Sequence, residues 1–175
     1  MRVLAATVCL VLVCASQSIA QSTIFVVRHA ERTDTPMPGS PPPKLAPPDQ
    51  PADPDLSPAG YARAASLAFT LSNAGITAIY VTSLKRTQQT AAPLAKALGL
   101  TPIVLAPAET AALIRRLREH HGAALVVGHG NTVPEIVKLL GVKESVALTD
   151  SDFDHLFVVT TPAAGIPTLV RLRYR

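Results

Sequence analysis

The sequence predicts an α/β fold: a three-layer sandwich with a mostly parallel sheet, helices on both faces and a C-terminal hairpin at one edge. Two short apolar runs rich in branched residues, at 24–27 and 124–127, are typical of strands buried on both faces. Strand and helix patterns alternate along the chain, as the crossovers of a parallel sheet require. The length of 175 residues suits one domain, and 48% apolar residues suffice for its core.

The first strand is expected over 23–28. The segment 34–58 follows, and its ten prolines predict an extended, polyproline-like loop rather than part of the core. At the end of this loop, Ser57 is typical of a helix N-cap and Pro58 of a first helical position. A helix is therefore expected from there to about residue 72.

The middle of the chain continues the alternation. A strand is expected over 77–82, and a helix over 84–98 that Gly99 stops. Pro93 should interrupt or bend this helix, because proline removes a backbone donor. A short third strand is expected over 102–105.

The last third predicts two helices and three strands. A helix over 109–121 leads to a strand over 123–128. The residues from Thr132 to Glu135 match a capping box that opens a helix through Leu140. Two final strands, at 156–160 and 168–173, predict the hairpin at the sheet edge.

The N-terminus predicts a secretory signal peptide over residues 1–20. Arg2 gives a basic start, an apolar stretch covers 3–15, and Ser18-Ile19-Ala20 is similar to a cleavage site. A membrane anchor, the alternative, needs about 18 apolar residues. We therefore expect a periplasmic or secreted domain of residues 21–175, with no stable membrane anchor after cleavage.

Cysteine content and charge limit the classes of function. Cys9 and Cys14 both lie in the predicted signal peptide, so the mature chain has neither disulfides nor thiolate metal sites. Loss of Arg2 lowers the formal net charge from +4 to about +3. Nucleic-acid binding needs clustered basic residues. The one dense cluster, over residues 115–118, is explained by a solvated helix face, so no nucleic-acid partner is expected.

Candidate site residues follow both apolar runs. Arg28 and His29 come after the first run, and His129 comes after the run 100 positions later. Sites in open α/β sheets lie beyond the carboxyl ends of the strands. A lone histidine there is usually structural, but two at equivalent strand ends beside an arginine suit phosphate chemistry. A metal pair lacks an obvious third ligand, and Arg28 would repel the cation, so no metal or cofactor is expected.

A third segment, residues 82–91, adds an anion-binding element. It lies at the end of one predicted strand and the start of a helix, where backbone N–H groups favour anions. Arg86 can add a bidentate contact to phosphate oxygens, although an arginine here is also common as a surface helix residue.

Four motifs in order resemble the histidine phosphatase superfamily, the phosphoglycerate-mutase-like group, over essentially the whole mature chain. Arg28-His29-Ala30-Glu31 is similar to its RHG-type signature, with alanine in the usual glycine place. Residues 56–60 resemble the L-[ST]-x-x-G helix start, and residues 82–91 resemble S-x-x-x-R-[TA]-x-x-T-A. Gly128-His129-Gly130 is similar to the second histidine motif. The chain thus resembles a small, single-domain and exported member.

The resemblance implies a specific mechanism. His29 would attack phosphorus and carry a phosphohistidine intermediate, which water would then hydrolyse to inorganic phosphate. Arg28, Arg86 and His129 would bind the phosphoryl oxygens without a metal. Ser83 and Asn131 are expected to add hydrogen bonds to the substrate. Glu31 is expected to position Arg28 or a neighbouring backbone group.

The general acid that protonates the leaving group stays open. In related enzymes it is often a carboxylate just after the third strand, and Glu109 matches that position. An acidic residue in a first helical turn, stabilised by the helix dipole, is the equally good alternative. Asp152 and Asp154 are second candidates, and some small members acting on phosphohistidine lack a clear acid.

These features predict an exported, metal-independent phosphomonoesterase. The alternatives are a phosphohistidine protein phosphatase and a non-catalytic phosphate-binding protein of the same fold. The partner would be a phosphorylated small molecule or a phosphoprotein. The proline-rich loop begins just after Glu31, and a lid, a partner-binding strip and a solvated loop are all consistent with its sequence.

Overall fold

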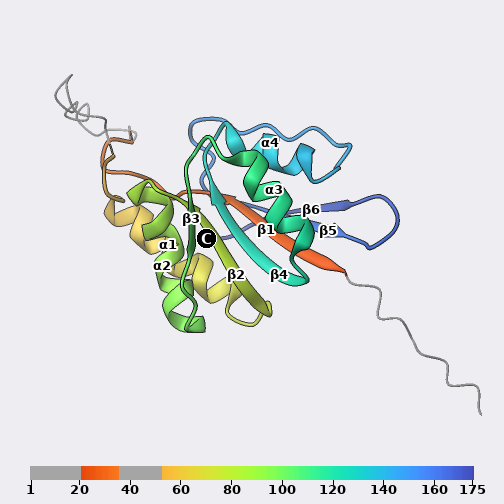
Figure 1. The fold of residues 1–175 in the computed structure, drawn as a ribbon. Helices are drawn as coiled ribbons and strands as arrows, with labels where there is room; N and C mark the ends of the chain where they lie inside the picture. The colour runs from red at the N-terminus through yellow and green to blue at the C-terminus, as the bar shows by residue number, and fades with distance from the viewer. Residues whose placement is uncertain (1–20, 36–52) are drawn as a thin grey trace, which may run out of the picture.

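The computed structural model describes residues 21–35 and 53–175, and it shows a six-stranded sheet between two pairs of helices (Figure 1). The predicted signal peptide and residues 36–52 of the proline-rich segment lie outside the described residues. The strands are β1 (Ser22–Arg28), β2 (Ile76–Thr82), β3 (Ile103–Leu105), β4 (Gly122–Gly128), β5 (His155–Thr161) and β6 (Thr168–Arg173). The helices are α1 (Pro58–Leu71), α2 (Lys85–Leu98), α3 (Thr110–Glu119) and α4 (Thr132–Leu139).

The sheet has the order β3-β2-β4-β1-β5-β6. β3, β2, β4 and β1 are parallel to one another, whereas β5 runs antiparallel to β1 and β6 antiparallel to β5. The predicted mostly parallel sheet with a C-terminal edge hairpin is confirmed. In the central pair, Arg28 at the end of β1 lies opposite Gly128 at the end of β4. Both histidine motifs therefore leave the sheet at the same edge.

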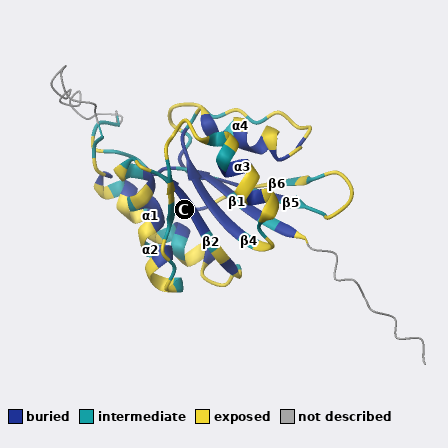
Figure 2. Cartoon of the chain, viewed as in Figure 1, coloured by how far each residue is buried: buried dark blue, intermediate teal, exposed yellow. Residues whose placement is uncertain are grey.

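Successive residues of the central strands face opposite layers. Ile24 and Val26 pack in one core cluster with residues of α3 and α4, whereas Val27 packs in another with residues of α1 and α2. Strands β1, β2 and β4 are largely buried, whereas the edge strand β6 and the outer faces of the helices are exposed (Figure 2). The three-layer prediction is confirmed. None of the described helices is long and apolar enough to span a bilayer.

The start of α1 confirms the role predicted for Ser57. Its Oγ accepts a hydrogen bond from Gly60 N at 3.1 Å, and Pro58 occupies the first turn. Gly60 also lies against the backbone of Glu31: a Cβ atom at Gly60 would lie 2.1 Å from the Glu31 carbonyl oxygen. The glycine of this motif thus lets α1 approach the residues that follow His29.

The structure corrects two local predictions for the helices. Helix α2 runs from Lys85 to Leu98 with Pro93 inside it, so the expected interruption does not occur, and the bend expected as the alternative stays a prediction. The capping box at α4 does not form, because Thr132 is the first residue of the helix and Asn131 occupies the N-cap position without a side-chain bond. The Thr132 hydroxyl instead accepts from His129 N at 2.9 Å.

Gly60→Ala tests the close approach of α1 to Glu31. Helix propensity alone would raise the melting temperature, because alanine favours a helix by about 1 kcal/mol over glycine. The backbone clash should outweigh this gain, since overpacking costs about 1–3 kcal/mol. We expect a lower melting temperature by circular dichroism. A higher one would show that the two backbones separate without cost.

Candidate active site

Both candidate histidines and both candidate arginines line one cavity of about 450 Å³ at the carboxyl edge of the sheet. Arg28 ends β1, His29 and His129 follow β1 and β4, and Arg86 lies in the first turn of α2. The two imidazole rings lie 5.5 Å apart, centroid to centroid. The predicted meeting of these four side chains is therefore what the structure shows. The remaining lining residues are Leu84, Pro107, Gly130, Asn131, Thr132, Leu148, Thr149 and Asp150.

His29 is held in one orientation and one tautomer. Its backbone N donates to Gly128 O at 2.9 Å, which extends the pairing of β1 with β4 by one residue. Its ring Nδ1 lies 2.8 Å from Ala30 O. A carbonyl oxygen only accepts, so Nδ1 carries the hydrogen and Nε2 keeps its lone pair.

The surroundings of His29 also keep the ring neutral. Burial, together with the positive charges of Arg86 and Arg28, lowers the pKa of His29 from 6.5 to about 3. The hydrogen bond to Ala30 opposes this effect only in part. At neutral pH the ring is therefore unprotonated at Nε2, the form that a nucleophile requires.

Thr90 connects the loop that carries His29 to the helix that carries Arg86. Its Oγ1 accepts from Ala30 N at 2.9 Å and lies 2.7 Å from Arg86 O, to which it donates. Thr90 and Ala30 are both fully buried. These two hydrogen bonds explain why a threonine suits the position of Thr90 in the third motif.

Arg28 is fixed by the loop that precedes β5. Its Nη1 donates to Thr149 O at 2.9 Å and to Asp150 O at 3.1 Å. Its guanidinium carbon lies 4.2 Å from the centre of the Phe153 ring, within the range of a cation–π contact. Burial lowers the pKa of Arg28, and the nearby Asp150 carboxylate opposes this effect.

Arg86 approaches the cavity from α2. Its Nη1 lies 3.7 Å from a carboxylate oxygen of Asp53, which also accepts from Lys85 N at the start of the helix. Burial lowers the pKa of Arg86, the positive charge of Arg32 lowers it further, and Asp53 raises it. Asp53, in the described end of the proline-rich segment, thus contacts the first turn of α2.

His129 completes the group. Its Nε2 lies 3.1 Å from Thr82 Oγ1. Burial lowers the pKa of His129 from 6.5 to about 4, and the charges of Arg86 and Arg28 act in the same direction. This second ring is therefore also neutral at neutral pH.

Three buried nitrogen atoms in this group lack a partner among the described residues. They are Arg28 Nε, Arg86 Nε and His129 Nδ1. Buried polar atoms are nearly always hydrogen-bonded, so three orphans around one cavity require an explanation. Two of these nitrogens belong to guanidinium groups, and the third belongs to an imidazole that can carry a hydrogen there. A tetrahedral oxyanion could accept a hydrogen bond from each of them.

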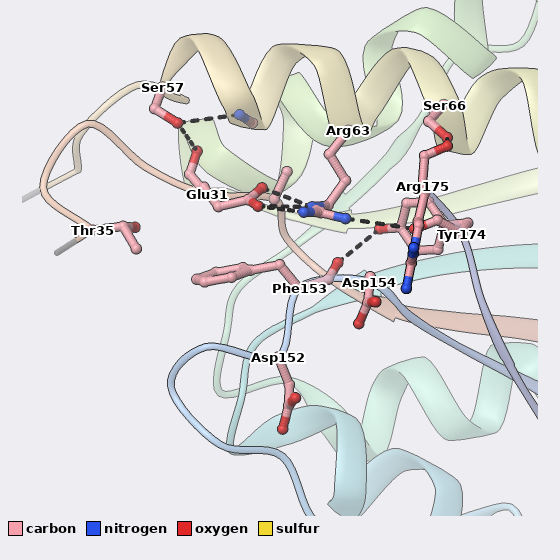
Figure 3. A network of polar contacts seen from close by, with 12 residues as sticks. Glu31, Thr35, Ser57, Arg63, Ser66, Asp152, Phe153, Asp154, Tyr174 and Arg175 are labelled. Carbon is pink, nitrogen blue, oxygen red and sulfur yellow. Dashed lines mark hydrogen bonds and ion pairs between the residues drawn. The ribbon is translucent and has the colours of Figure 1, made fainter. Parts of the chain in front are cut away.

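The role expected for Glu31 is only partly correct. Its carboxylate pairs with Arg63 of α1, at 2.6 Å from Oε1 to Nη2, and not with Arg28 (Figure 3). Its carbonyl oxygen accepts from Ser57 N at 2.9 Å, so it does hold neighbouring backbone. In the same network, the Tyr174 hydroxyl donates to Phe153 O at 3.2 Å and so supports the ring beneath Arg28 (Figure 3).

Glu109, the first candidate for the general acid, does not line the histidine cavity. Its Oε2 accepts from Ala106 N at 2.7 Å, and it borders a neighbouring cavity of about 30 Å³. Asp152 is bound to Thr149 N at 2.7 Å, and Asp154 pairs with Arg173 at 3.1 Å.

The two predicted substrate-binding residues differ in position. Asn131 lines the cavity, whereas Ser83 is exposed and does not border it. Asp150, which sequence reasoning missed, is an exposed residue that lines it. Phe153 was also missed, since no local signal marks it. Thr82 could have been found, because it occupies the serine position of the third motif.

Comparisons with known proteins agree with this geometry. Residues 24–108 match the family model of the histidine phosphatase superfamily (branch 1). The structure is similar to that of the protein histidine phosphatase SixA complexed with tungstate, with 19% identity, a TM-score of 0.61, and 86% of this chain and 96% of that chain covered. It is also similar to phosphoglycerate mutase from Bacillus anthracis str. Sterne, with 13% identity, a TM-score of 0.63, and coverage of 88% and 93%. The mycobacterial glucosyl-3-phosphoglycerate phosphatase shares 14% identity at a TM-score of 0.54, with 80% and 90% covered.

Likenesses at these identities establish a shared fold. No curated protein matches the sequence of this chain.

The lowered pKa values of the two histidines predict a loss of stability in acid. Both rings titrate near 6.5 in the unfolded chain but near 3 and 4 when folded. As the pH falls below about 6.5, only the unfolded state takes up these protons, so the free energy of unfolding decreases. The melting temperature should therefore drop from pH 8 to pH 5, and the drop should be smaller in His29→Asn. Equal drops would show that His29 titrates alike in both states.

Proposed function

Because the chain belongs to the histidine phosphatase superfamily, we propose that it is a phosphatase working through a phosphohistidine intermediate on His29. The observation that carries this proposal is the geometry of the His29 ring. Its Nδ1–H is bound to Ala30 O, so the lone pair of Nε2 is left in a cavity that two arginines line. A neutral imidazole held in this way needs no separate base.

The reaction has two displacement steps. Nε2 of His29 attacks phosphorus, the N–P bond forms, and the bond to the leaving group breaks. Water then attacks phosphorus, the N–P bond breaks, and inorganic phosphate leaves with the water proton passed to solvent or to a phosphate oxygen. Arg28, Arg86 and His129 stabilise the charge on the phosphoryl oxygens in both steps, and no metal is part of the proposal.

The surroundings of the cavity favour substrates with good leaving groups. Of the carboxylates in the described residues, only that of Asp150 lines the cavity, and this residue is exposed to solvent. None of the described carboxyl groups is therefore buried in this cavity, where burial would favour the protonated form that a general acid requires. Aryl phosphates, and phosphoramidates whose nitrogen leaves readily, depend least on an acid.

A second candidate function is hydrolysis of phosphohistidine on a protein. The lack of a buried carboxyl group among the described residues that line the cavity favours it, because phosphohistidine is itself a phosphoramidate. The similarity in fold to a protein histidine phosphatase supports it as well. We further propose that the enzyme is exported, as residues 1–20 have the pattern of a signal peptide, and that its mature chain begins near Gln21.

His29→Ala tests the nucleophile and also the alternative of a non-catalytic phosphate-binding protein. We expect turnover of p-nitrophenyl phosphate to fall by several orders of magnitude, because the variant lacks the nitrogen that forms the bond to phosphorus. Wild-type protein quenched during turnover should carry acid-labile, base-stable phosphate, and the variant should carry none. His121→Ala, which changes an exposed histidine outside the cavity, should retain activity. A fully active His29→Ala would remove His29 from this role.

The dependence of the rate on the leaving group tests whether the site contains a general acid. A general acid contributes about 10²- to 10⁴-fold to the rate. Glu109→Gln and Asp150→Asn should therefore change kcat/KM for an aryl and an alkyl phosphate by similar, small factors, while the wild type itself strongly prefers the aryl ester. If either variant lost activity on the alkyl ester alone, by a hundredfold or more, that residue would be the proton donor. The value of kcat/KM for a phosphorylated histidine peptide, measured in the same way, tests the second candidate function.

A further inference from the structure

The orientation of the His129 ring depends on a single hydroxyl group. Thr82, the last residue of β2, places Oγ1 3.1 Å from His129 Nε2. The other ring nitrogen, Nδ1, is buried and has no partner among the described residues. Because this ring lines the cavity, Nδ1 is the atom that it has left for a ligand.

A second hydroxyl lies behind the first. Thr87 Oγ1 is 3.0 Å from Thr82 Oγ1, accepts from Thr82 N at 3.1 Å, and lies 2.9 Å from Leu84 O. Thr87 is fully buried. Each hydroxyl donates one hydrogen and accepts up to two. The hydrogens can therefore run from His129 through both threonines to Leu84 O, or from Thr87 through Thr82 to His129.

The two directions give His129 different chemistry. A neutral imidazole donates through one nitrogen and accepts through the other. In the first direction Nε2 carries the hydrogen and Nδ1 presents a lone pair, which repels an anion. In the second direction Thr82 donates to Nε2, and Nδ1 carries the hydrogen. Only the second arrangement can bind a phosphoryl oxygen, which has no hydrogen to offer.

We propose that Thr82 is a positioning residue for phosphoryl transfer: with phosphate bound, its hydroxyl donates to His129 Nε2, so that the Nδ1–H of His129 donates to a phosphoryl oxygen. The lowered pKa of His129 fits this assignment. A neutral ring carries its hydrogen on only one of its two nitrogens, so a neighbouring group must select which nitrogen that is. This inference rests on the proposed function, but it concerns the second histidine and not the nucleophile.

The experiment uses the intact protein with orthovanadate as the probe. Nitrogen-15 NMR of the histidine side chains distinguishes the protonated from the unprotonated ring nitrogen, and His129→Asn identifies the signals of His129. In the wild type with saturating vanadate, we expect the hydrogen on Nδ1. In Thr82→Val, which removes the hydroxyl at nearly constant shape, this preference should be lost, and vanadate affinity should fall about tenfold. Thr82→Ser should restore both properties.

Thr77→Val is the matched control. Thr77 lies in the same strand, and its Oγ1 is 3.2 Å from His120 Nε2, so the variant removes the same kind of contact outside the cavity. We expect it to bind vanadate like the wild type.

The inference would be overturned if the NMR spectra placed the hydrogen on Nε2 of His129 in the vanadate-bound wild type, whatever the variants do. An unchanged tautomer and affinity in a folded Thr82→Val would overturn it as well. Activity remaining in His29→Ala would instead contradict the proposed function and leave the tautomer result standing.

Discussion

The chemistry of this protein depends on the register between β1 and β4. Parallel pairing sets Arg28 opposite Gly128, and one further hydrogen bond, from His29 N to Gly128 O, continues the ladder beyond the strand. Side chains alternate between the faces of a sheet, so a slip of one residue would move a histidine to the wrong side. The apolar residues of β1 belong to two different cores, one on each face, and this double burial excludes the slip.

The site gathers positive charge around one cavity at the edge of the sheet. Arg28 is stabilised by carbonyl oxygens and an aromatic face, and Arg86 by the carboxylate of Asp53. The two histidines avoid mutual repulsion by staying neutral. Donors are thereby held ready before any ligand arrives, and little reorganisation is needed when a phosphoryl group binds. The same arrangement makes the native state sensitive to acid, because stability is lost when the rings are forced to take up protons.

The sequence was most informative where local pattern and chemistry coincide. The apolar runs before His29 and His129 predicted buried strands, and a strand end implies a position at the sheet edge whatever the rest of the chain does. Predictions that depended on distant partners were less successful. Glu31 pairs with Arg63 of α1, a partner far away in the sequence. The capping box failed for a local reason, since the Thr132 hydroxyl accepts from His129 N three residues earlier. The loop that fixes Arg28 left no local signal, since its contacts are made by backbone carbonyls and by the ring of one phenylalanine.

The antiparallel bridge between Arg32 and Leu56, with the bond from Thr33 N to Asp55 O, joins the two ends of the proline-rich segment beside α1 and α2. The described residues on either side of positions 36–52 are thereby fixed to each other. Doubling the length of a flexible loop costs only about 0.6 kcal/mol once its ends are held. A reporter module or a tag inserted between Thr35 and Asp53 should therefore leave the six-stranded core unaltered.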